Sequence, residues 1–127
     1  MKHAADWVPI PKRALIKQER AWVDDILSVN PEWSDVSHDE LYAVAKCPCG
    51  LCKTVLLEAP PEPQNPRTIS KRGLLGEIDI QIESGELITV MLFADGGSLT
   101  ELEIVCEHSF KAVPDTWKEV ARWINVG

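Results

Sequence analysis

The stretch from Leu74 to Cys106 constrains the fold of this 127-residue chain more than any other. Apolar and polar residues alternate from Glu77 to Glu83, a period of two that places successive side chains on opposite faces of a strand. Leu87–Phe93 is an almost continuous apolar run, as expected of a central strand. The alternation returns from Leu99 to Cys106. Because glycine-containing turns separate the three segments, the sequence predicts an antiparallel meander.

The two turns determine the register of this meander. If each is a three-residue loop, formed by residues 83–85 and 95–97, the isoleucines of the first strand align with apolar residues of the other two strands on one face, whereas a slip of one residue exchanges the faces. The core face is then expected to hold two rows, Ile78 with Val90 and Leu102, and Ile80 with Ile88 and Ile104. The opposite face is expected to hold Glu77, Met91 and Glu101 in one row, Asp79, Thr89 and Glu103 in the next, and Phe93 and Leu99 beyond them.

The meander also carries the net charge of the chain. Residues 73–110 include eight carboxylates and no lysine or arginine, and the formal net charge is −7. Like charges on neighbouring strands cost stability, so the segregation has two interpretations: a solvated face that protects strand edges, or a docking surface for a basic partner. We favour the docking surface because apolar residues are interleaved with the charges. The predicted contact residues are Glu77, Asp79, Met91, Phe93, Leu99, Glu101 and Glu103.

The N-terminal part of the chain predicts a helix over the sheet. Val8–Pro11 is expected to be extended, and Lys12–Val29 has apolar residues at the three- and four-residue spacing of an amphipathic helix. Asn30-Pro31 ends this helix, because proline disfavours helical geometry at the residue before it. The length of the chain fits a single domain over residues 1–127.

Two further strands and a second helix complete the expected fold. Leu41–Lys46 and Lys53–Glu58 predict a hairpin, and residues 68–71 are a candidate short strand. Pro114–Ile124 has proline near its start and an acidic residue in its first turn, which predicts a C-terminal helix. The expected fold class is therefore α+β: an antiparallel sheet of about five strands with an N-terminal and a C-terminal helix packed on it.

The turn of the predicted hairpin is rich in cysteine. Cys49 and Cys52 have the spacing of a zinc knuckle, Cys47 adds a third thiol, and Cys106 or His108 is a candidate fourth ligand. Structural zinc sites are usually built from two separated Cys-x-x-Cys pairs, and the second pair is absent. We therefore expect reduced cysteines packed in a tight turn and no cofactor, with structural zinc as the less favoured alternative.

Composition excludes several classes of function. The acidic balance argues against direct nucleic-acid binding, which requires clustered lysine and arginine. No apolar run approaches the roughly 20 residues that span a bilayer, and the N-terminus has no apolar signal core, so a cytoplasmic location is expected. The three histidines are scattered along the sequence without a nucleophile motif, so we expect no enzymatic activity.

Two segments carry a resemblance to a known family. Cys47–Leu57 has a cysteine and glycine turn before a Thr-Val-x-Leu strand, and Met91–Ile104 has a strand, an Asp-Gly turn and a Leu-x-x-Leu-Glu strand. This pattern resembles a large family of small bacterial proteins, some of which are similar to the immunity proteins of contact-dependent growth inhibition. The resemblance implies a protein that binds and neutralises a cognate toxin, often a basic nuclease. The alternative is a zinc-stabilised small binding module with another partner.

Overall fold

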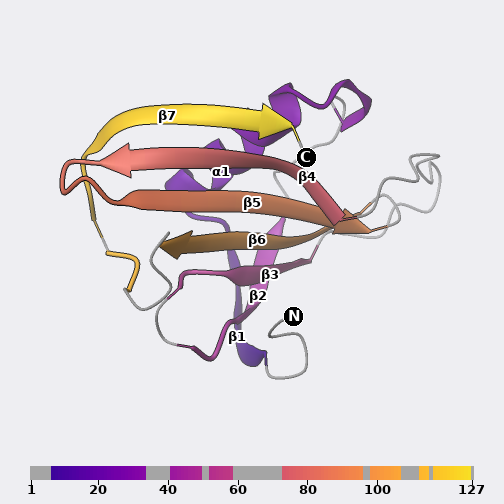
Figure 1. Cartoon of the computed structure of the whole chain (residues 1–127). Coiled ribbons are helices and arrows are strands. Elements are labelled where there is room, and N and C mark those ends of the chain that lie inside the picture. The colour runs from indigo at the N-terminus through magenta and orange to yellow at the C-terminus, as the bar shows by residue number, and fades with distance from the viewer. Residues whose placement is uncertain are drawn as a thin grey trace.

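The structure is a computed structural model that describes residues 7–33, 41–49, 52–58, 73–95, 98–106, 112–114 and 116–126. Its centre is an antiparallel sheet with the strand order β1-β2-β3-β6-β5-β4-β7, which Figure 1 shows with the single α-helix of the described residues behind it. The antiparallel sheet and the N-terminal helix are confirmed. The expected count of about five strands was too low, because the sheet has seven.

The elements follow one another along the chain in a simple order. They are β1 (Val8–Ala14), α1 (Lys17–Ser28), a short 3-10 helix η2 (Pro31–Trp33), β2 (Tyr42–Lys46), β3 (Val55–Glu58), β4 (Gly73–Ile82), β5 (Leu87–Asp95), β6 (Ser98–Cys106) and β7 (Glu119–Val126). The candidate strand at residues 68–71 lies outside the described part of the chain.

The first turn of the meander has the predicted geometry. Ile78 pairs with Val90 and Ile80 with Ile88, as expected for a three-residue loop. Gly85 in this loop has a φ of 93°, a left-handed conformation that glycine adopts without the strain a Cβ atom would cause. The predicted register between β4 and β5 is therefore confirmed.

The second turn of the meander differs from the prediction. Asp95 pairs with Ser98, so two residues connect the strands instead of three, and an irregularity between Phe93 and Ala94 then shifts the register by one further residue. A two-residue connection alone would exchange the faces of β6, and the bulge restores them. Val90 consequently pairs with Ile104 and not, as predicted, with Leu102.

The predicted C-terminal helix is wrong. Glu119–Val126 forms β7, which pairs with β4 from Gly76 to Ile82. The segment contains β-branched and aromatic residues that suit a strand as well as a helix. The edge of β4 offers this segment a row of backbone hydrogen-bonding partners. Pairing with that edge stabilises the strand more than the local helical spacing of its apolar residues favours a helix.

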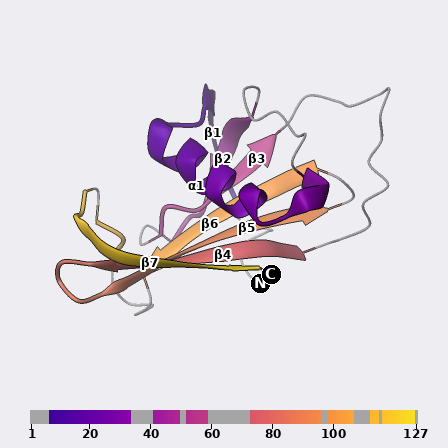
Figure 2. The ribbon, with the colours of Figure 1, turned by 90° about the horizontal axis from the view of Figure 1, so that it is seen from above.

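The helix α1 covers one face of the sheet. Figure 2 shows it on a single side, across the strands of the meander, and its buried side chains are Glu19, Trp22, Val23, Ile26 and Leu27. Gly76 in β4 allows the closest approach, because a Cβ atom there would lie 2.8 Å from Cγ2 of Ile26. The helix starts later than predicted, since Lys12–Ala14 belongs to β1, and it ends before Asn30-Pro31 as expected.

The core lies between α1 and the inner face of the sheet. Its buried side chains come mainly from the meander, with Val55 and Leu57 of β3 and the apolar side of α1. Within the described part of the chain, no helix is both long and apolar enough to cross a membrane.

Candidate functional site

The predicted acidic residues lie together on the outer face of the sheet, the side opposite α1. Strand alternation puts Glu77 and Asp79 of β4 on this side, because the residues between them are buried in the core. Glu77 pairs with Met91, which pairs with Glu103, and Phe93 pairs with Glu101. We call Glu77, Asp79, Glu101 and Glu103 the acidic face. The register of β6 is shifted by two residues from the prediction, so that Met91 pairs with Glu103 and not with Glu101. All four carboxylates still share one side with Met91 and Phe93.

Two of the predicted contact residues are poorly accessible. Leu99 is 3% exposed and belongs to the core, opposite Ala94. The two-residue connection between β5 and β6 places Leu99 on the inner side of the sheet, because the bulge restores the faces only after it, so its assignment to the contact surface is corrected. Glu103 is on the outer face, but it is only 8% exposed. Glu77, Asp79, Met91, Phe93 and Glu101 remain partly exposed.

The carboxylates of β4 are close enough to influence each other. Burial, together with a hydrogen bond and charge repulsion from Asp79, raises the pKa of Glu77 above its usual value of 4.5. Asp79 accepts hydrogen bonds from Oγ1 of Thr89 at 3.2 Å and from Nδ2 of Asn125 at 3.4 Å. These donors hold the carboxylate of Asp79 in place. The repulsion between the two carboxylates therefore contributes to the raised pKa of Glu77.

An exposed tryptophan adjoins the acidic face. Trp123 of β7 pairs with Asp79 and is 52% exposed. Sequence reasoning missed it because residues 114–124 were expected to form a helix, in which its orientation could not be related to β4. Large aromatic side chains with a polar edge are frequent anchors of protein interfaces.

The edge strand β7 is tied to α1 on the inner side. Arg122 forms ion pairs with Asp25 of α1 and, at 2.8 Å, with Glu119 of its own strand. The hydrogen bond from Arg122 lowers the pKa of Glu119. Arg122 pairs with Ile80 in the sheet, so this cation lies on the face opposite the acidic residues.

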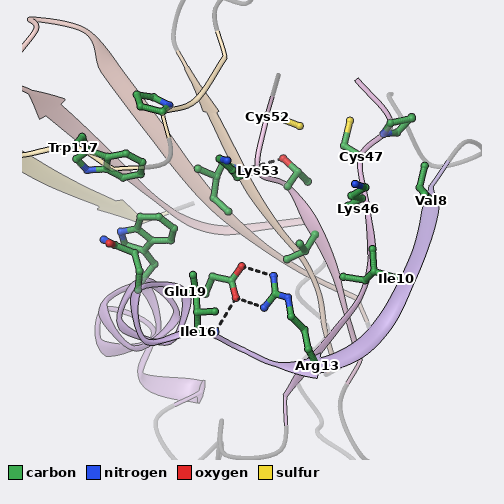
Figure 3. Close-up of a pocket in the computed structure, with 17 residues that line it drawn as sticks. Val8, Ile10, Arg13, Ile16, Glu19, Lys46, Cys47, Cys52, Lys53 and Trp117 are labelled. Carbon is green, nitrogen blue, oxygen red and sulfur yellow. Dashed lines mark hydrogen bonds and ion pairs between the residues drawn. The ribbon is translucent and has the colours of Figure 1, made fainter. Parts of the chain in front are cut away.

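A pocket of about 610 Å³ opens on the helix side of the sheet. Figure 3 shows Glu19 of α1 and Arg13 of β1 joined across its floor, by two hydrogen bonds of 2.9 and 3.1 Å. Glu19 also accepts the backbone N–H of Ile16 at 3.0 Å, which satisfies one free donor at the start of the helix. This buried carboxylate therefore has a structural partner on each side.

Aromatic and basic residues form the other walls of the pocket. Trp22 and Trp117 stack with ring centroids 6.0 Å apart and ring planes inclined by 9°. Lys46 and Lys53 contribute cationic side chains near the end of the β2–β3 hairpin. No sequence pattern predicted this pocket, because it depends on the position of α1 relative to four strands and the chain before β7.

Three cysteine side chains come together at the rim of this pocket, those of Cys47, Cys49 and Cys52. We call these three residues the thiol turn. One ligand atom from each lies within 4.8 Å of the others, and Sγ of Cys49 is 3.3 Å from Sγ of Cys52. Burial, followed by contacts with the other two cysteines, raises the pKa of Cys47 to about 12. The thiol of Cys47 is therefore neutral at neutral pH.

Cys106 does not join the thiol turn. It lies at the end of β6, opposite Ile88, and is buried in the hydrophobic core. The candidate zinc ligand set of four cysteines is thus reduced to three, and His108 falls outside the described residues.

Comparison with known proteins adds no assignment: no family model, no curated protein and no solved structure matches the chain. The resemblance to immunity proteins therefore stays a prediction from the two sequence segments.

Proposed function

We propose that the chain is an immunity protein that binds a cognate toxin through the acidic face and blocks the toxin's basic surface. The observation that carries this proposal is the strand register, which gathers Glu77, Asp79 and Glu101 on one side of the sheet although they come from two strands. A nuclease presents a cationic groove to phosphate, and an acidic surface complements such a groove. No catalytic step by this chain is part of the proposal.

Apolar residues beside the charges support a specific interface. Met91 and Phe93 lie between the acidic strands on the outer side of β5, and the exposed Trp123 extends the same surface onto β7. Rim charges mainly accelerate encounter, whereas buried aromatic anchors supply most of the affinity. We expect salt to slow association without abolishing binding, because screening removes only the electrostatic contribution to the affinity.

A stoichiometric titration tests the proposal. The toxin to test is the product of the gene immediately upstream, because the gene of an immunity protein lies immediately downstream of its toxin gene. Adding this protein to a fixed amount of that toxin in a DNA or RNA cleavage assay should give a break at equal concentrations. Full protection at a small fraction of equivalence would indicate catalysis, and absence of protection at any ratio would refute the immunity proposal.

A charge reversal with a matched control locates the interface. Glu77→Lys should slow association by roughly tenfold at low salt, because steering by charges acts on the on-rate. Glu58→Lys makes the same charge change in β3, where Glu58 is exposed and forms an ion pair with Lys12 at 3.2 Å. An equal effect of both variants would show that the net charge, and not the acidic face, governs binding.

A further inference from the structure

We propose that Cys47, Cys49 and Cys52 bind one zinc ion as three thiolates, and that the fourth coordination position opens toward the pocket beside α1. This inference is independent of the toxin and of the acidic face, because the thiol turn lies on the other side of the sheet. It reverses the expectation of a turn that holds only reduced cysteines.

The sulfur positions fit a tetrahedral metal site. Zinc binds thiolates at about 2.3 Å, so two sulfurs of one tetrahedral site are roughly 3.8 Å apart. The three Sγ atoms lie within 4.8 Å of one another, and those of Cys49 and Cys52 are 3.3 Å apart. Each sulfur therefore needs to move by about an ångström or less to share an ion.

Backbone donors already point at two of the sulfurs. The N–H of Cys49 donates to Sγ of Cys47 at 3.5 Å, and the N–H of Cys52 donates to Sγ of Cys49 at 3.3 Å. Hydrogen bonds of this kind orient metal ligands and stabilise their negative charge. A turn that served only to connect two strands would not require them.

The turn is also anchored to the sheet on both sides. The N–H of Cys47 donates to the carbonyl of Thr54 at 3.2 Å, and the N–H of Lys53 donates to the carbonyl of Ile104 at 2.9 Å. The buried hydroxyl of Thr54 accepts the N–H of Ile104 at 3.1 Å. The first bond joins the two flanks of the turn to each other, and the other two fix the flank at Lys53 and Thr54 on β6, so the ligands are held in place before the metal binds.

The pocket explains why three protein ligands suffice. Cys47 and Cys52 both line it, and Figure 3 shows their sulfurs at its upper end. Three protein ligands with an open fourth position are characteristic of zinc sites that bind an exchangeable ligand, whereas purely structural sites are closed. A zinc ion with three thiolates has a net charge of −1, and the side chains of Lys46 and Lys53, which line the same pocket, offset it.

Cobalt(II) substitution tests the site on the intact chain. Cobalt is added to the reduced, metal-free protein under anaerobic conditions, and we expect one ion per chain, with the intense visible bands of a tetrahedral thiolate complex that equimolar zinc removes. Cys49→Ser should lose the bands and weaken binding at least tenfold, and because Cys49 is exposed the variant should keep the wild-type circular dichroism spectrum. Cys106→Ala is the matched control and should retain the bands. Absence of the bands in the wild type, or their survival in Cys49→Ser, would overturn the proposal.

A second measurement tests the open position. Imidazole added to the cobalt protein should shift the visible bands, because a small ligand can reach the metal through the pocket. The spectrum of His108→Ala should match that of the wild type. Bands that do not respond to imidazole, or that are lost in His108→Ala, would show that the site is closed by a fourth protein ligand.

Discussion

Replacement of Glu77 by glutamine should stabilise the folded protein at neutral pH. Glu77 and Asp79 are two residues apart on one face of β4, a separation of about 7 Å at 3.4 Å per residue. Two unit charges at this Cα separation repel by about 0.6 kcal/mol in a water-like dielectric and by about four times more at an effective dielectric constant of 20, and the hydrogen-bonded carboxyl groups lie closer than the Cα atoms. Allowing for solvent screening of a partly exposed pair, we expect a gain of about 0.5–1 kcal/mol, which corresponds to an increase in Tm of about 2–4 °C for a domain of this size.

The pH dependence identifies the cause of this gain. The pKa of Glu77 in the folded protein is raised above 4.5, so the folded state holds the proton more tightly than the unfolded state. The destabilisation by the carboxylate is therefore absent below the unfolded pKa and complete above the raised folded pKa. The advantage of Glu77→Gln should appear as pH rises above about 4.5 and should be constant at neutral pH. Thermal melts followed by circular dichroism from pH 4 to 8 measure it.

Two control variants separate charge repulsion from other effects. Gln81→Glu places a new carboxylate two residues from Asp79 on the same face of β4, so it should lower Tm by a similar amount. Glu58→Gln removes a carboxylate that has a lysine partner in an exposed pair, so it should change stability by less than about 0.5 kcal/mol and without a gain. If Glu77→Gln melts at the wild-type temperature at pH 7, or if its advantage is the same at pH 4 and pH 7, repulsion on the acidic face does not determine the stability of β4.

Two further predictions concern the neighbours of β7, first their packing and then an ion pair. Gly76→Ala would place a Cβ atom 2.8 Å from Cγ2 of Ile26 and 3.1 Å from the carbonyl oxygen of Asn125, so urea denaturation should show a loss of about 1–3 kcal/mol. Ile26→Leu removes that Cγ2 atom and should recover part of the loss in the Gly76→Ala background, whereas a simple sum of the two losses would contradict the proposed clash. Arg122→Ala should lower Tm at pH 7. The lowered pKa of Glu119 gives stability that is present above about pH 4.5 and is lost as pH falls through the pKa of the folded state. The Arg122→Ala variant should therefore lose part of the acid sensitivity of the wild type. An unchanged dependence of Tm on acid pH would contradict this role of Arg122.

The strands of the meander could be predicted because their faces follow from a period of two. Ile78 and Ile80 point inward and Glu77 and Asp79 outward whatever the rest of the chain does. The position of Leu99 could not be predicted in this way, because a shorter connection and a bulge each shift the register by one residue. Both shifts together return every later residue to the expected face, and only residues between the turn and the bulge change sides.

The C-terminal strand could not be derived from local sequence. Its apolar residues occur at spacings that satisfy a helix, and the deciding feature is the free edge of β4, which belongs to the tertiary structure. The error also concealed Trp123, since a residue acquires a defined neighbour on the acidic face only when its strand is paired with β4. The pocket was hidden for the same reason, because residues from β1, α1 and the β2–β3 hairpin meet only after folding.

The acidic face and the thiol turn lie on opposite sides of the sheet. Along β6 this separation follows from the alternation of outward and inward side chains that also identified the meander in the sequence. In β6, Glu103 faces outward beside Met91, and the next residue, Ile104, faces inward and lines the pocket below the thiol turn. The carboxylates of the acidic face and the proposed thiolate ligands at the pocket are thus kept on opposite sides of the sheet, where neither set competes for the partner of the other. A basic protein surface could cover the outer face while the pocket stays open, because access to the metal position is from the side of α1. The two proposals therefore stand or fall separately.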